Sequence, residues 1–306
     1  MNDQKKGIGY ALTTAFLWGF LAIFLKIAVH KVDPQTIVWF RFTVAFVCLA
    51  CWQLFKDPQS FRIISRPPRM LLYAAVALAL NYLGFMLAVH YTTPSNAQLI
   101  AQTGPILFAF SGIFFFQERL RKLQIAGFLL AITGFYLFYS QEIKLMIGTE
   151  QRYNTGVLIG LGGAVAWVVY AILQKKLVVY YSGNTLNLFI FGFPDIDYLP
   201  FIKLSSLQGL STGWWVLMIF LGLNTLLAYG SLAQALRLSQ ANKVSIIVLL
   251  NPIITFICMS FVGDFGLSYL KSESFTRYTL IGALVVLAGA ILVIRKSPTR
   301  RLKHNQ

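Results

Sequence analysis

Arg41, Asp195 and Asp197 lie within long apolar stretches of the chain. Charged groups are costly in hydrocarbon, so they face the interior of a helical bundle or a water-filled cavity. Arg41 is suited to attract a carboxylate or to balance an acid on a neighbouring helix, although helix-end carbonyls would satisfy a purely structural arginine. Because Pro194 precedes both acids, we expect the helix to be broken or kinked there. Arg41 and Asp195 would then form an ion pair sensitive to protonation, unless residues 194–200 form a hydrated turn at the outer interface.

Amide and aromatic side chains add further candidates for a cavity. Gln98 and Gln102 are four residues apart and therefore share a helix face, and Pro105 loosens the backbone one turn later. Trp18 and Trp167 lie near mid-span, away from the interfaces where aromatic belts sit, and they predict a cavity wall. The other candidates for substrate binding are Asn81, Tyr82, Tyr170, Asn224, Tyr229 and Asn251. Hydrogen bonds between helices or simple ring packing would explain the same residues without a ligand.

Residue patterns for catalysis are missing from the sequence. His30, His90 and His304 belong to no spacing that could hold a catalytic metal, and no Gly-rich loop for nucleotide phosphates is present. Cys48 and Cys51 form a CxxC in the middle of an apolar helix, where small packing residues are the better interpretation than a redox pair. No serine has a nearby histidine and acid in sequence. We therefore expect no catalytic residue, no metal and no cofactor.

Composition places these residues in a bilayer. The 306-residue chain is 57% hydrophobic and only 12% charged, whereas globular domains are about a quarter charged. We expect an all-α integral membrane fold with ten transmembrane helices, each long enough to cross about 30 Å of hydrocarbon. The predicted spans are 8–29, 35–55, 70–90, 94–116, 122–140, 155–179, 184–204, 213–235, 241–263 and 277–295.

The second half of the chain repeats the first. Trp18 and Lys26 recur as Trp167 and Lys175, 149 residues later. Further pairs at nearby offsets are Gly7 with Gly156, Tyr82 with Tyr229, Ala88 with Ala235, Pro105 with Pro252, Gly127 with Gly282 and Gly134 with Gly289. An odd number of spans inverts the second copy, so we expect two inverted five-helix repeats, 1–149 and 150–306. The alternative is that apolar helices resemble one another by composition.

The distribution of basic residues predicts the orientation in the membrane. The net charge is +16, and with the N-terminus inside, eighteen Lys and Arg residues fall on the inner side against six outside. This asymmetry predicts that both termini are cytoplasmic, with a basic C-terminal tail. It also makes the lipid bilayer, and not a nucleic acid, the expected partner of the positive charge.

Several short motifs carry a family resemblance. In chain order they are Trp18-Gly19 with Lys26, Arg41-Phe42, the Pro105 helix ending in Glu118-Arg119-Leu120, and the helix with Gly127 and Gly134. Over about residues 7–295 the sequence resembles the EamA-type members of the drug/metabolite transporter (DMT) superfamily. The resemblance implies ten helices around a central cavity, cytoplasmic termini, and export or exchange of small metabolites such as amino acids. The family's acid after the fourth span is matched by Glu118, whereas its second counterpart is only loosely kept as Asp264-Phe265.

These observations favour a secondary active transporter in the inner membrane that moves a small organic solute by alternating access. A cavity with aromatic walls and few charges favours an amino acid or a related zwitterionic or amphipathic solute over a polyanion. Protons are the candidate coupling ion. The alternative is a non-transporting membrane receptor or assembly protein on the same fold, which large extramembrane loops would better suit.

Overall fold

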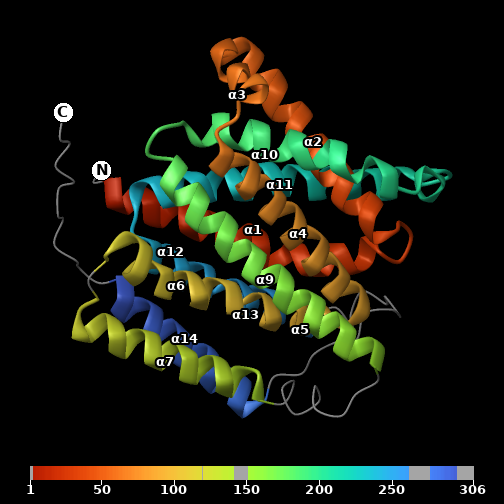
Figure 1. Cartoon of the computed structure of the whole chain (residues 1–306). Coiled ribbons are helices and arrows are strands. Elements are labelled where there is room, and N and C mark those ends of the chain that lie inside the picture. The colour runs from red at the N-terminus through yellow and green to blue at the C-terminus, as the bar shows by residue number, and fades with distance from the viewer. Residues whose placement is uncertain (1–2, 119, 141–150, 262–275, 295–306) are drawn as a thin grey trace, which may run out of the picture.

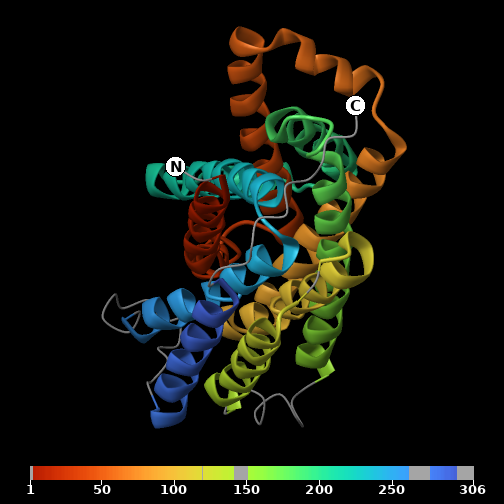
Figure 2. The same cartoon turned by 90° about the vertical axis from the view of Figure 1, so that its left-hand side faces the viewer.

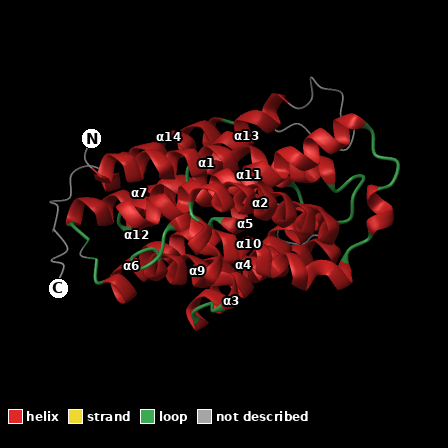
Figure 3. Cartoon of the chain, turned by 90° about the horizontal axis from the view of Figure 1, so that it is seen from above, coloured by secondary structure: helices red, strands yellow, loops and turns green. Residues whose placement is uncertain are grey.

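The computed structural model describes residues 3–118, 120–140, 151–261 and 276–294. Within these ranges every regular element is a helix (Figure 3). The helices of the first half are α1 (Asp3–Ala28), α2 (Pro34–Lys56), α3 (Arg62–Ser65), α4 (Arg69–Tyr91), α5 (Pro94–Ala101), α6 (Thr103–Phe116) and α7 (Lys122–Phe138). Those of the second half are α9 (Gln151–Leu177), α10 (Gly183–Tyr198), α11 (Thr212–Leu238), α12 (Ala241–Val248), α13 (Asn251–Phe261) and α14 (Arg277–Ile294).

Side-chain caps start the second helix of each half at equivalent positions. The Asp33 carboxylate accepts a hydrogen bond from the Thr36 backbone N–H at 3.3 Å, and Pro34 occupies the first turn of α2. The Ser182 hydroxyl accepts one from the Thr185 backbone N–H at 3.1 Å, at the start of α10. Such caps satisfy backbone donors that have no partner in the first helical turn.

Eight helical segments are long and apolar enough to cross a membrane. They overlap eight of the predicted spans. The fifth and seventh predicted spans correspond to α7 and α10, which are shorter, with 17 and 16 residues. An all-helical, multi-pass membrane fold is therefore present, and the full set of ten spans stays a prediction.

Two predicted spans are each built from a pair of helices. The fourth consists of α5 and α6, separated at Gln102, and the ninth of α12 and α13, separated at residues 249–250. Proline has no backbone N–H, so Pro105 and Pro252 cannot bond the carbonyls four residues earlier. Those carbonyls belong to Ala101 and Val248, the last residues of α5 and α12. The two prolines thus account for where both helices end.

The seventh predicted span differs from its expectation. α10 continues through Pro194 as far as Tyr198, so residues 194–200 are not a turn as the alternative required. A short 3-10 turn at Leu199–Phe201 then ends the helix. A proline close to the end of a helix disturbs only the last turn, because few backbone bonds remain beyond it.

Helices of the two halves pack against one another throughout the bundle. α4 lies along α9, α1 lies along α11, and α2 packs against both α10 and α11 (Figures 1 and 2). α7 and α14 form a separate pair at one end of the molecule (Figure 1). In the expected repeats, α1 is equivalent to α9 and α4 is equivalent to α11. Replacing each helix by its equivalent turns the α4–α9 contact into the α11–α1 contact, so the two contacts are equivalent.

Glycines allow the closest of these approaches. A Cβ atom on Gly134 would lie 2.6 Å from the Val286 backbone nitrogen, and one on Gly127 would lie 2.8 Å from the Gly289 carbonyl oxygen. A Cβ on Gly84 would lie 2.8 Å from the Gly163 Cα, where α4 crosses α9. The glycines of α7 and α14 therefore allow the backbones of these two helices to lie in close contact.

Candidate substrate cavity

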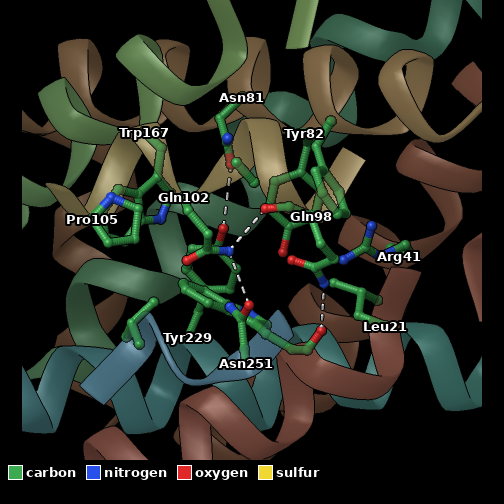
Figure 4. Close-up of a pocket in the computed structure, with 14 residues that line it drawn as sticks. Leu21, Arg41, Asn81, Tyr82, Gln98, Gln102, Pro105, Trp167, Tyr229 and Asn251 are labelled. Carbon is green, nitrogen blue, oxygen red and sulfur yellow. Dashed lines mark hydrogen bonds between the residues drawn. The ribbon is translucent and has the colours of Figure 1, made fainter. Parts of the chain in front are cut away.

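A cavity lies at the centre of the bundle, between the helices of the two halves (Figure 4). Its volume is about 70 Å³, which is room for several water molecules. Most of the predicted binding residues line it, namely Trp18, Arg41, Asn81, Tyr82, Gln98, Gln102, Trp167, Tyr229 and Asn251. Ala101 and Val248 also line it, so the cavity reaches the breaks in both divided helices. Tyr170, Asn224 and Asp195 are not part of the lining.

Amide side chains hold the cavity walls together. Gln98 Nε2 donates to the Trp18 carbonyl oxygen at 3.0 Å. Gln102 Nε2 donates to the Gln98 carbonyl oxygen and to Asn251 Oδ1, both at 3.0 Å. Asn81 Nδ2 donates to the carbonyl oxygen of Gly163 at 3.0 Å. Part of each amide is therefore used in interhelical bonding, as the ligand-free interpretation of these residues expected.

Three polar atoms of lining residues remain without a hydrogen bond to any described residue. They are Gln102 Oε1, Trp167 Nε1 and the Tyr82 hydroxyl, and all three are buried. An amide oxygen accepts, an indole N–H donates and a phenolic hydroxyl can do either, so these atoms could bind both donors and acceptors of a ligand. Buried polar groups are costly when unpaired, which favours occupation of the cavity by water or a polar solute.

Aromatic rings form one wall of the cavity. The ring centroid of Trp18 lies 6.0 Å from that of Trp167 and 5.3 Å from that of Tyr229. Tyr82 lies 5.5 Å from Tyr229 on the other side. Tyr170 packs behind Tyr229 at 5.6 Å and is fully buried, so it supports the wall without reaching the cavity. These separations are typical of tilted and edge-to-face aromatic contacts.

Arg41 enters the cavity from α2, but not as part of the predicted ion pair. Its Nε donates to Thr225 Oγ1 at 3.1 Å, and its Cζ lies 4.5 Å from the centroid of the Tyr82 ring. Asp195 Oδ1 accepts from Thr43 Oγ1 at 2.5 Å, and no ion pair joins it to Arg41. Positions 41 and 43 are about 200° apart around a helix, so α2 presents them to different neighbours. The predicted contact between Arg41 and Asp195 is wrong for this conformation.

Asn224 acts within the bundle and not in the cavity lining. Its Nδ2 donates to the Leu17 carbonyl oxygen at 2.9 Å and so joins α11 to α1. Thr255 makes a similar link between α13 and α1, donating to the Gly19 carbonyl oxygen at 2.6 Å. These bonds brace the backbone on either side of Trp18 and hold its ring at the cavity wall.

A charged cluster lies just beyond the end of α6 and joins the two halves of the chain. Glu118 Oε1 and Oε2 accept hydrogen bonds from the backbone N–H groups of Ala241 and Asn242, at 2.7 and 3.2 Å. Lys175 Nζ lies 3.6 Å from Glu118 Oε1 and donates to the Ser239 carbonyl oxygen at 2.8 Å. The carboxylate therefore caps α12 from the opposite half of the chain.

The repeat-related lysine, Lys26, makes comparable bonds to backbone carbonyls within its own half of the chain. Lys26 Nζ donates to the carbonyl oxygens of Val89 and Thr92 at 2.8 and 2.7 Å, at the end of α4. Its identity with Lys175 at an offset of 149 residues was the signal for this shared role. Asp264, the loosely kept counterpart of Glu118, lies outside the described residues.

Comparison with known proteins gives the family. The profile of the EamA-like transporter family matches residues 5–140 and again residues 154–295. The chain belongs to this family. The "Uncharacterized inner membrane transporter YhbE" of Escherichia coli (strain K12) is 33% identical, with 94% of this chain and 91% of that protein covered. The "Probable amino-acid metabolite efflux pump" of Salmonella typhimurium (strain LT2) is 25% identical over 98% of both.

A solved structure supports the same fold. A crystal structure with 17% sequence identity matches at a TM-score of 0.74, covering 94% of this chain and 96% of the other. Family membership assigns a general transporter role to this EamA-family chain, and its apolar helices make it a multi-pass membrane protein.

Proposed function

We propose that the protein is a secondary active transporter that moves a small organic metabolite across the cytoplasmic membrane by alternating access. The observation that carries this proposal is the central cavity, which lies between the halves and reaches the breaks in both divided helices. Binding sites at such breaks are typical of carriers built from repeats. A cavity of about 70 Å³ has room for several waters, and a small polar solute could take their place.

Two inverted five-helix repeats, 1–149 and 150–306, are part of this proposal. The family profile matches once in each half, and equivalent residues such as Trp18 and Trp167 meet at the cavity. The exchanged packing of α1, α4, α9 and α11 is what a two-fold axis in the membrane plane would produce. The excess of basic residues on one side favours cytoplasmic positions for both termini.

The lining supports an amino acid or a related zwitterionic or amphipathic solute. Rings from Trp18, Trp167, Tyr82 and Tyr229 offer an apolar surface, while Gln102 and its amide neighbours offer hydrogen bonds. Mixed apolar and polar linings of this kind are typical of small-molecule sites. The name of the Salmonella relative refers to amino-acid metabolites, which makes this class the first to test. Protons are the proposed coupling ion.

Counterflow in proteoliposomes tests the proposal. Purified protein is loaded with one unlabelled solute at a time and offered labelled amino acids, nucleosides, nucleotide sugars, polyamines and hydrophobic cations, with and without a pH gradient. We expect saturable flux of an amino-acid-like solute. Tyr82→Ala should reduce it strongly, because the ring forms part of the wall, whereas Tyr73→Ala should not, because Tyr73 is 65% exposed on the same helix. Correctly inserted protein without flux for any class would refute carrier function for these solutes.

A further inference from the structure

Among the residues that the structure describes, no carboxylate pairs with the guanidinium of Arg41. We propose that Arg41 is the anion-binding end of the cavity and receives the carboxylate of the transported solute. This inference rests on the transport function proposed above and adds to it the chemical group by which the solute is recognised.

The neighbours of Arg41 are neutral. The side chain is 2% exposed, its Nε–H is used by the Thr225 hydroxyl, and its guanidinium faces the Tyr82 ring at 4.5 Å. No carboxylate lies within 4.0 Å of it in the part of the chain that the structure describes. The ring stabilises a cation without neutralising it, so the charge remains to be balanced. A buried charge without a counter-ion is strongly unfavourable, and a ligand anion removes that penalty.

The geometry favours a carboxylate over other anions. The Nε–H of Arg41 donates to the Thr225 hydroxyl and so fixes the orientation of the guanidinium. The N–H groups on its two terminal nitrogens can then bind a planar acceptor such as a carboxylate. Among the described residues that line the cavity, Arg41 is also the only Lys or Arg. A single positive charge balances a monoanion, whereas a phosphate dianion would leave excess negative charge in a buried site. Asp195 is held by Thr43 and does not compete for Arg41.

Arg41 also breaks the symmetry of the repeat. Phe42 and Phe191 are equivalent at the offset of 149 residues, and their ring centroids lie 6.4 Å apart. The residue equivalent to Arg41 is therefore Ile190, a buried aliphatic side chain. Figure 4 places Arg41 across the cavity from Trp167 and Pro105. The cavity thus has a cation at one end and the Trp167 ring at the other, which orients a solute that has a carboxylate at one end and an apolar group at the other.

Acetate is a suitable probe because it carries the proposed group and is small enough for the cavity as observed. Purified full-length protein in detergent is titrated with acetate, with the isosteric neutral acetamide and with phosphate, at constant ionic strength. Binding is followed by the midpoint of thermal unfolding and by tryptophan fluorescence, since Trp18 and Trp167 line the site. We expect saturable binding of acetate that is at least about tenfold tighter than that of acetamide or phosphate, as charge-assisted bonds predict.

Substitutions assign the effect to Arg41. Arg41→Gln should weaken acetate binding by about tenfold or more, and Arg41→Lys should fall between the two because it keeps the charge and loses the fork. The control is Arg66→Gln, which removes the same charge from an exposed position and should bind as the parent does. If Arg41→Gln does not fold, the preference of the parent protein for acetate over acetamide and phosphate still decides the question.

The two proposals fail in distinguishable ways. Equal binding of acetate and acetamide, tighter binding of phosphate, or unchanged acetate binding in Arg41→Gln would overturn the anion site while leaving counterflow untouched. Selective acetate binding that depends on Arg41, with no counterflow of any solute, would support the site and count against transport of the tested classes.

Discussion

Removing the charge of Glu118 should open the bundle on the side expected to be cytoplasmic. Glu118 accepts two backbone hydrogen bonds at 2.7 and 3.2 Å and lies 3.6 Å from Lys175 Nζ, with the two side chains only 8% and 13% exposed. Glu118→Gln keeps one oxygen acceptor and loses the second acceptor and the ion pair. Charge-assisted bonds in buried settings contribute about 1.5–3 kcal/mol. We therefore expect a loss of about 2–3 kcal/mol from the closed arrangement, which is about a 30- to 150-fold shift in the equilibrium.

Cysteine accessibility measures that shift. Ser245 lies one turn inside α12 and is fully buried, so Ser245→Cys in a background without the native cysteines reports on separation of α12 from α6. Labelling by a membrane-impermeant maleimide should accelerate by at least about tenfold in Glu118→Gln. The matched control is Asp57→Asn, which removes one exposed acid expected on the same side and should leave the rate unchanged. Equal labelling rates in Glu118→Gln and Asp57→Asn would show that the cluster does not hold this side closed.

Three further outcomes are expected. Asp195→Asn should abolish the dependence of counterflow on a pH gradient, because the amide cannot take up a proton as the acid can. Thr43→Val removes only the hydrogen-bond partner of Asp195 and should preserve that dependence. An unchanged dependence in Asp195→Asn would exclude this residue as the proton carrier. Gly134→Ala should lower the thermal unfolding midpoint, since overpacking costs about 1–3 kcal/mol. Gly162→Ala should not, because a Cβ atom there would have no neighbour within 4 Å among the described residues. Similar midpoints for both variants would contradict the packing argument. Reporter fusions at both termini should be active only in the cytoplasm, and activity of either outside would reverse the predicted topology.

Much of the cavity lining could be predicted from the sequence, because polar side chains are costly at membrane depth and Trp normally lies at the membrane interfaces. On these grounds Gln102, Trp18 and Trp167 were predicted to face the lumen, and the structure places all three in the lining. The helical membrane fold could be predicted from the long apolar stretches of the chain. The partners of Arg41 could not be predicted, because they depend on which face of α2 meets α11 and which meets α10.

Contacts between segments that are far apart in the sequence could not be predicted either. Glu118 and the α12 backbone donors are separated by more than 120 residues, and their contact depends on how α6 ends. α6 ends at Phe116, and the next residue, Gln117, has a φ of 50° in the left-handed region; this turn brings the Glu118 carboxylate to α12. A glutamine gives no clear signal for that conformation, which glycine and asparagine adopt more readily.

The bond between Gln102 and Asn251 connects the cavity to the divided helices. Gln102 lies between α5 and α6, and Asn251 starts α13 directly after the corresponding break. The two side chains are 149 residues apart, so they occupy equivalent positions in the proposed repeats. Each break gives its span a joint about which the two parts can tilt. A solute that forms a hydrogen bond with the Gln102 amide would replace its bond to Asn251, which connects the two helix breaks. In the proposed carrier, solute binding and reorientation of the halves would therefore depend on the same pair of side chains.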